Sequence, residues 1–272
     1  MTFTLLCALI LLGSCTGFLA GLLGIGGGMI LTPFITLILS MDPTIPQTHI
    51  VHIAIATSMA SILFTSLSSV RAHAQHNAVL WPVLSMLIPG IILGSMIGAQ
   101  VAGSLSSFWV TLIFTLFVSY SAIKMFLPKK AATQRTLPGR AGLFGVGSGI
   151  GFISSIVGAG GGFIAVPFLS SCQVPLQKAI GTSAAIGFPI ALFGTIGYIY
   201  SGWSQRALPA WPVMLGYIHL PALLCIAGMS IIMAPLGASI AHRIDTKPLK
   251  RIFACILLCL ATYMAYRTVM AW

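Results

Sequence analysis

The chain has 272 residues, of which 58% are hydrophobic and only 6% are charged, and its formal net charge at pH 7 is +11. Soluble globular domains carry about 25% charged residues, so this composition excludes a soluble domain and indicates a polytopic membrane protein. The lysines and arginines do not form the basic stripe with interleaved aromatic residues that nucleic-acid binding requires. They match instead the lysine and arginine excess of cytoplasmic loops, and we expect a lipid bilayer and no nucleic acid as partner.

The apolar segments follow one another in the same order in both halves of the chain. We predict membrane helices where an apolar run approaches the roughly 20 residues that cross a bilayer. In the first half they cover about residues 3–23, 28–40, 49–70, 79–101 and 107–127. In the second half they cover about residues 141–158, 162–171, 178–201, 211–235 and 249–271. The first run has no lysine or arginine before it, so we expect an uncleaved membrane segment rather than a signal peptide.

The two halves form an internal repeat. Residues 17–34 read GFLAGLLGIGGGMILTPF and residues 151–168 read GFISSIVGAGGGFIAVPF, with nine of eighteen positions identical. The motif A-I-x-T-S, where x is Ala56 or Gly181, ends at Ser58 in the first half and at Ser183 in the second. Such a repeat predicts two equivalent structural units. We expect an N-terminal transmembrane repeat over 1–127, a basic cytoplasmic linker over 128–140 and a C-terminal transmembrane repeat over 141–272.

The distribution of basic residues predicts how the repeats are oriented. If the 128–140 linker is cytoplasmic and each glycine-rich segment pair enters and returns, each half crosses the membrane an odd number of times. Eleven of the thirteen lysines and arginines then face the cytoplasm, and only Arg206 and Arg267 lie outside, as the positive-inside rule demands. We therefore expect an all-α polytopic membrane protein of two inverted-topology repeats. Each repeat has a glycine-broken helix pair followed by three transmembrane helices, and both termini lie outside.

The glycine clusters are the most unusual feature of these apolar segments. Glycine inside a helix costs roughly 1 kcal/mol relative to alanine. One explanation is close helix packing or a hinge, because small residues let membrane helices approach each other. We favour a second one, a break in the helix, because the segments after the clusters are too short for an untilted span. The glycines concerned are Gly24, Gly26, Gly27 and Gly28 in the first half and Gly158, Gly160, Gly161 and Gly162 in the second.

Broken helices at matching positions of two inverted repeats predict a transporter binding site. A helix that begins at the break presents unpaired N–H groups and the positive end of its dipole, which together bind anions without an arginine. Hydroxyl side chains of the A-I-x-T-S motifs would assist, although membrane serine and threonine often bond only their own helix or a neighbour. The hydroxyl candidates are Thr57, Ser58, Thr182 and Ser183.

The paired G-x-G-G-G…P-F motifs, the paired A-I-x-T-S motifs and the basic central linker resemble the TauE/SafE family of sulfite and organosulfonate exporters. This resemblance covers essentially the whole chain. It implies a bacterial inner-membrane protein that exports a small sulfur-containing anion, such as sulfite, sulfoacetate or a related organosulfonate, by alternating access. The family's glycine motifs carry over onto the eight glycines named above. The alternatives are a membrane protein with a structural or regulatory partner, and an importer of thiosulfate-like anions.

The remaining polar residues predict no second chemistry. We expect His49, His52 and His219 to be interfacial and structural, although a histidine can also relay protons. Gln100 is expected at a helix interface, although it can also be a polar gate. Asp42 and Asp245 are the only acidic residues, and both lie in predicted loops.

No carboxylate pair, nucleophile–base pair or cysteine–histidine cluster with ligand spacing occurs in the sequence. The sequence therefore predicts no enzyme, catalytic residue, metal site or cofactor. It leaves open which sulfur anion is moved, the coupling ion, the direction of net flux, and whether the chain forms a homodimer.

Overall fold

The computed structural model describes most of the chain, namely residues 3–24, 26–42, 45–126, 136–203, 205, 208, 213–241 and 247–270. Most of the predicted 128–140 linker lies outside the described residues. So do Arg206, Arg243 and Asp245, which also entered the sequence analysis.

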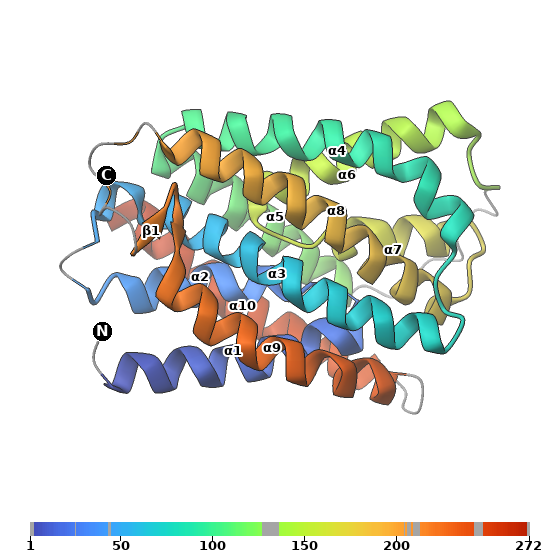
Figure 1. Ribbon diagram of the computed structural model, residues 1–272, viewed down its shortest axis with the longest axis horizontal. Coiled ribbons are helices and arrows are strands. Elements are labelled where there is room, and N and C mark those ends of the chain that lie inside the picture. The colour runs from blue at the N-terminus through green and yellow to red at the C-terminus, as the bar shows by residue number, and fades with distance from the viewer. Residues whose placement is uncertain are drawn as a thin grey trace.

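The described chain is almost entirely helical, as predicted (Figure 1). The first half contains α1 (Phe3–Leu23), α2 (Gly28–Leu39), the short helix η1 (Gln47–His49), α3 (Ile50–Gln75), α4 (Trp81–Ser104) and α5 (Ser107–Phe126). The second half contains α6 (Arg140–Val157), α7 (Gly162–Ser171), α8 (Leu176–Trp203), α9 (Leu220–Ala241) and α10 (Lys247–Met270). Among the described residues, 8 helices are long and apolar enough to cross a membrane, whereas α2 and α7 are shorter. The prediction of an all-α polytopic membrane protein is thereby confirmed.

The boundary of one predicted span was wrong. We expected a helix over 211–235, but α9 begins at Leu220, with Pro221 in its first turn, where proline is tolerated. Just before it, β1 (Met214–Leu215) and β2 (Ile218–His219) pair as an antiparallel ribbon. Their two-residue turn begins at Gly216, whose φ of +57° suits a glycine at the start of a hairpin turn. Gly216 in the turn and Pro221 in the first turn thus mark where the helix begins, which hydropathy alone does not locate.

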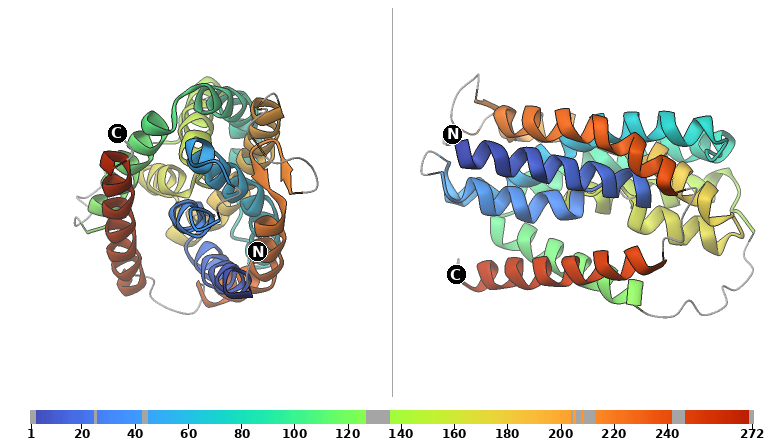
Figure 2. Two further views of the ribbon diagram at one scale, coloured as in Figure 1. Left: turned by 90° about the vertical axis from the view of Figure 1, so that its left-hand side faces the viewer. Right: turned by 90° about the horizontal axis from the view of Figure 1, so that it is seen from below.

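Helices α3 and α8 form the core of the bundle and lie against each other. Over an apolar stretch of 18 residues, 83% and 78% of the residues are buried in these two spans, compared with 33–44% in the other six. Helix α2 packs on α3 and α7 packs on α8, while α1 packs on α9 and α4 packs on α6 (Figure 2). The outer pairs therefore join one half of the chain to the other. The halves are interlocked rather than side by side.

Two stripes of small residues bring the outer pairs into backbone contact. Glycines at four-residue spacing on α4 face α6, and a second set on α1 faces α9: Gly90, Gly94 and Gly98, and Gly13, Gly17 and Gly21. A Cβ atom placed on Gly94 would lie 2.1 Å from the carbonyl oxygen of Ser148. Because no side chain separates these backbones, the pairs are held by close van der Waals contact, as small residues permit in membranes.

We expect Gly94→Ala to lower the thermal unfolding midpoint of the purified protein, because the added methyl group must push α4 away from α6. Overpacking of this kind costs about 1–3 kcal/mol. Gly149→Ala on α6 is the matched control, because Gly149 is exposed and no atom lies within 4 Å of a Cβ placed there. Equal melting of the two variants in the same detergent would contradict the close packing of α4 on α6.

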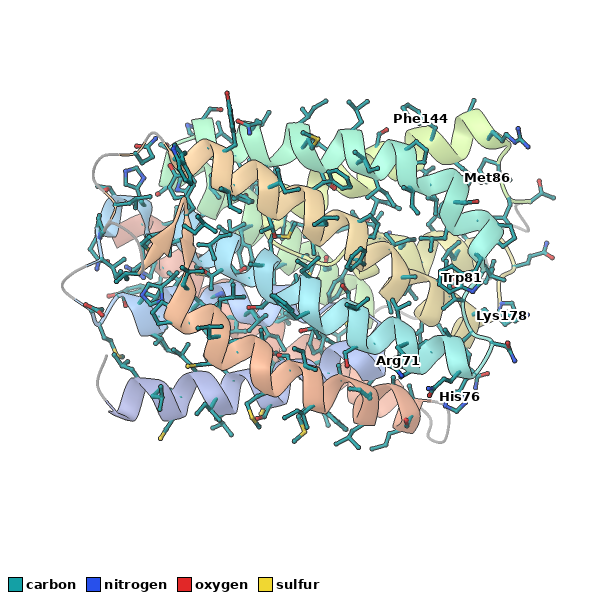
Figure 3. The ribbon with its side chains drawn as sticks, in the orientation of Figure 1. Arg71, His76, Trp81, Met86, Phe144 and Lys178 are labelled. Atoms are coloured by element: carbon teal, nitrogen blue, oxygen red, sulfur yellow. The ribbon has the colours of Figure 1, made fainter. Side chains whose placement is uncertain are left out.

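The two ends of the bundle differ in charge. Helix α1 begins and α10 ends at the same end, which we call the terminal face (Figures 1 and 2). Arg71, His76 and Lys178 lie at the opposite end, which we call the basic face (Figure 3). Trp81 lies at this end as well, at the start of α4. Basic residues gathered at one end are typical of a membrane protein in which that end faces an aqueous compartment.

Candidate functional site

Each glycine cluster is a break between two helices. Helix α1 ends at Leu23 and α2 begins at Gly28, and α6 ends at Val157 and α7 begins at Gly162. Five glycines in these breaks have positive φ values between 65° and 77°: Gly24, Gly26, Gly27, Gly158 and Gly161. A residue with a side chain pays roughly 1–2 kcal/mol in that left-handed conformation. The glycines are therefore required by the backbone path and not only by packing.

The two breaks cross each other at mid-length of the core helices. A Cβ atom on Gly26 would lie 2.8 Å from Cα of Gly160, its counterpart in the other half. One on Gly28 would lie 2.0 Å from the carbonyl oxygen of Gly158. Ile62 in the middle of α3 and Gly187 in the middle of α8 contact this crossing. Non-helical backbone is thus buried in protein at membrane depth, the condition under which a membrane protein tolerates it.

The serines of the A-I-x-T-S motifs brace the break of the opposite half. The Ser183 hydroxyl donates a hydrogen bond to the carbonyl oxygen of Gly24 at 2.9 Å. The Ser58 hydroxyl lies 3.3 Å from the carbonyl oxygens of both Gly158 and Gly28, and its one hydrogen can be donated to either. Because Gly24 and Gly158 are counterparts in the repeat, the two braces are equivalent.

The threonines of the same motifs have a second pair of equivalent partners. Thr57 Oγ1 accepts a hydrogen bond from the backbone N–H of His219 at 3.0 Å. Thr182 Oγ1 accepts one from the backbone N–H of Leu80 at 2.9 Å. His219 and Leu80 immediately precede α9 and α4, the corresponding helices of the two halves. Each threonine thus satisfies a backbone donor just before a helix of the other half.

A small cavity adjoins the crossing. Gly26 and Gly160 line it together with Ser183 and, from α3, Ser66 and Ser69. Its volume is about 10 Å³, about what one water molecule needs. The Ser69 hydroxyl is buried and has no hydrogen-bond partner among the described residues. The crossing therefore has room for one small polar occupant, and an anion larger than water requires it to open.

The structure brings the predicted site residues together to this extent. The two glycine clusters meet, Ser58 and Ser183 contact them, and Thr57 and Thr182 lie one residue earlier, bonded to helix starts. In this conformation the serine hydroxyls donate to backbone carbonyl oxygens. Contact of these residues with a substrate stays a prediction.

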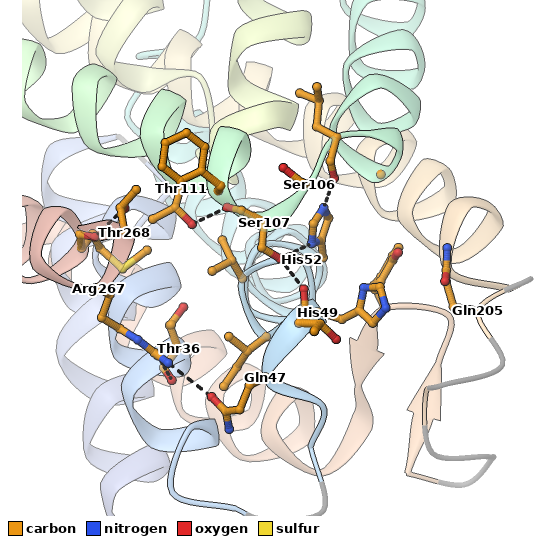
Figure 4. A pocket seen from close by; sticks show the side chains of 18 of the residues that line it. Thr36, Gln47, His49, His52, Ser106, Ser107, Thr111, Gln205, Arg267 and Thr268 are labelled. Atoms are coloured by element: carbon orange, nitrogen blue, oxygen red, sulfur yellow. Dashed lines mark hydrogen bonds between the residues drawn. The ribbon is translucent and has the colours of Figure 1, made fainter. Parts of the chain in front are cut away.

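A larger cavity of about 720 Å³ opens at the terminal face (Figure 4). Its walls come from the C-terminal part of α2, from η1 and the start of α3, from the turn between α4 and α5, and from the last turns of α10. Arg267, His49 and Gln47 contribute polar groups. The sequence analysis placed His49 near the mouth of a span and Arg267 outside, but it did not bring them together. No local pattern links residues so far apart in the chain.

The histidines have structural contacts, as expected from the sequence. His52 Nε2 lies 3.0 Å and 3.1 Å from the carbonyl oxygens of Ala102 and Leu105, which ties α3 to the end of α4. His219 Nδ1 accepts a hydrogen bond from the backbone N–H of Ala222 and so caps α9. Burial lowers the pKa of His219, which favours the neutral ring that this acceptor role needs.

Gln100 also lies at a helix interface. Its Nε2 donates a hydrogen bond to the carbonyl oxygen of Gly197 at 3.2 Å, which joins α4 to α8. The sequence analysis expected such an interface position for Gln100.

Comparison with known proteins places the chain among membrane transporters. A relative from Haemophilus influenzae, named as a probable membrane transporter protein, is 36% identical over 265 residues, which cover 97% of this chain and 98% of the relative. Two others, named in the same way, come from Methanocaldococcus jannaschii and Bacillus subtilis. They are 27% and 26% identical and cover 96% and 95% of this chain, and 95% and 96% of their own lengths. No solved structure matches the chain.

The family described as sulfite exporter TauE/SafE matches residues 9–264. These residues include both glycine breaks, both A-I-x-T-S motifs and most of the terminal-face cavity. The family and the relatives are transporters, so the expectation that the chain is not an enzyme is confirmed. The chain belongs to the sulfite exporter TauE/SafE family of membrane transporters.

Proposed function

We propose that this protein exports a small sulfur-containing anion, such as sulfite, sulfoacetate or a related organosulfonate, by alternating access. The observation that carries the proposal is the crossing of the two glycine breaks, with Gly26 against Gly160, at mid-length of α3 and α8. Discontinuous helices that meet at the bilayer midplane are the usual substrate site of transporters built from repeats. The family description names sulfite, which supports an anion of this chemical class.

The anion would be held by backbone amides at the breaks. Helices α2 and α7 begin there, and their third and fourth N–H groups already donate to the carbonyl oxygens of Gly27 and Gly161. The first two N–H groups of each helix are the ones that have no acceptor within the helix. The positive ends of two helix dipoles would add to the attraction. The Ser69 hydroxyl in the adjoining cavity has no partner in the described part of the chain, which supports a polar occupant. The proposed contacts are Gly24, Gly26, Gly27, Gly28, Thr57, Ser58, Gly158, Gly160, Gly161, Gly162, Thr182 and Ser183.

Two inverted repeats, 1–127 and 141–272, would supply the moving parts. Equivalent contacts support them: Gly98 packs on the carbonyl oxygen of Phe152, and Gly237 packs on that of Phe18, the counterpart of Phe152. Arg71 and Lys178 at the basic face support a cytoplasmic location for that face and a periplasmic one for both termini in an inner membrane. The terminal-face cavity would then open outward above a closed crossing. Alternating access requires such a conformation.

The test is transport by the purified protein in liposomes. Sulfite, sulfoacetate, thiosulfate, taurine and chloride are offered separately, with and without a pH gradient, and protein-free liposomes serve as the control. We expect selective flux of sulfite or of an organosulfonate such as sulfoacetate, and a response to the pH gradient would show proton coupling. Flux of chloride and thiosulfate only, or of none of the five from folded protein, would contradict the proposal.

A further inference from the structure

Arg267 is the one arginine or lysine among the described residues that line the terminal-face cavity. It lies in the last turn of α10, is half-buried, and faces the terminal-face cavity. Its guanidinium group donates hydrogen bonds to the carbonyl oxygen of Thr36 at 3.4 Å and to Gln47 Oε1 at 3.2 Å (Figure 4). Both acceptors are uncharged, and both distances are long for hydrogen bonds.

The surroundings of Arg267 suit an anion. Among the described residues that line the cavity there is no aspartate or glutamate. The lining offers hydroxyl and ring groups instead, including Thr48, Ser106 and His49. A guanidinium group is always charged, has five donors, and matches the two oxygens of an oxyanion with a pair of parallel hydrogen bonds. Partial burial weakens its screening by water and salt, which makes the attraction stronger than on an open surface.

We propose that the terminal-face cavity is a second anion site, where Arg267 binds a small oxyanion such as sulfite or sulfate. This inference rests on the proposed function for its ligand class, but it uses residues that lie apart from the glycine breaks. The site holds the anion at the outer, periplasmic end of the transport path. Its volume of about 720 Å³ accommodates the ion together with water.

The hydrogen bonds of Arg267 link this site to the crossing. Thr36 lies near the C-terminal end of α2, and the other end of α2 is Gly28 in the break. An oxyanion on Arg267 competes with the carbonyl oxygen of Thr36 and with Gln47 for the same N–H donors. Binding through these donors releases the hydrogen bond from α10 to α2, the helix whose start must move for the crossing to open.

The test compares anion binding by Arg267→Gln and Arg267→Lys with that by the unmodified protein. Sulfite and sulfate are titrated into purified folded protein by calorimetry, at constant ionic strength set with chloride. We expect Arg267→Gln to bind about tenfold to a hundredfold more weakly, as loss of a charged hydrogen-bond donor implies. Arg267→Lys keeps the charge but not the paired donors, and its affinity should fall between the two. Unchanged affinity in both variants would overturn the proposal.

Lys124→Gln is the matched control, because it removes one positive charge at a residue that does not line the cavity. Lys124 lies in the last turn of α5, and its ammonium group lies over the Tyr120 ring. The affinity of this variant for the anion should equal that of the unmodified protein. An equal loss of affinity in both glutamine variants would show that net charge alone causes the loss, and would contradict the site. Sulfate should also protect Arg267 from the arginine reagent phenylglyoxal, as read at that residue by mass spectrometry. Lack of protection would contradict the location.

The two proposals can fail separately. If the liposomes transport no sulfur-containing anion while sulfite binding depends on Arg267, the proposed function fails and the second site stands. If transport occurs and Arg267→Gln binds sulfite as tightly as the unmodified protein, the second site fails and the proposed function stands.

Discussion

Replacing Gly28 by alanine is expected to reduce sulfur-anion transport about a hundredfold. The new methyl group would lie 2.0 Å from the carbonyl oxygen of Gly158 and 2.6 Å from Cδ1 of Ile62. The isoleucine can rotate away, but Gly158 is backbone of the other break and cannot move without displacing the whole crossing. Displacement of a binding group by about 1 Å is enough for a loss of that size. Initial rates in liposomes, normalised to the amount of folded protein, give the measurement.

Gly228→Ala is the matched control for this variant. Gly228 is an exposed residue of α9, and no atom lies within 4 Å of a Cβ placed there. Its transport rate should be unchanged, and its stability should rise slightly, because alanine favours a helix by up to about 1 kcal/mol over glycine. Gly28→Ala should also melt at a lower temperature, since overpacking costs about 1–3 kcal/mol. Full transport by Gly28→Ala would show that the crossing is not the site.

The positions of the helix breaks were predictable because their cause is local. A residue with a side chain is costly at positive φ, so a backbone path such as that of Gly24, Gly26 and Gly27 leaves a glycine cluster in the sequence. The repeat strengthened the inference, because the cluster recurs before Gly162 at the same spacing. The bounds of the helices around both breaks then followed closely.

The partners of the polar side chains were not predictable, because they depend on contacts between the halves. Ser58 and Gly158 are separated by 100 positions, and Ser183 and Gly24 by 159. Nothing in the local pattern of A-I-x-T-S distinguishes a hydroxyl that donates a hydrogen bond to the backbone of a break from one that binds a ligand. Arg267 and Thr36, 231 positions apart, likewise meet only in the fold. The terminal-face cavity was therefore missed, although Arg267 stood out as one of only two basic residues expected outside.

The two threonines of the A-I-x-T-S motifs should contribute to the stability of the folded protein. We expect Thr57→Val with Thr182→Val to lower the thermal unfolding midpoint strongly and each single variant to lower it less, with the larger share from Thr57→Val. Valine has nearly the same shape as threonine but cannot accept the N–H groups of His219 and Leu80. A buried donor left without a partner costs about 1–3 kcal/mol, which applies to the N–H of His219, whereas the half-buried N–H of Leu80 costs less because water can reach it.

Thr262→Val isolates the role of the acceptor from the general effect of replacing threonine. Thr262 is exposed on α10, and its hydroxyl only donates to the carbonyl oxygen of Leu258 in the same helix. Its removal should leave the midpoint nearly unchanged, because Leu258 keeps its helical hydrogen bond. Both single variants, at Thr57 and at Thr182, should lower the midpoint, because each threonine accepts from the residue that precedes a corresponding helix. An unchanged midpoint in either single variant would contradict the equivalence of the two halves, since both threonines are fully buried and each accepts the N–H of the residue before a helix.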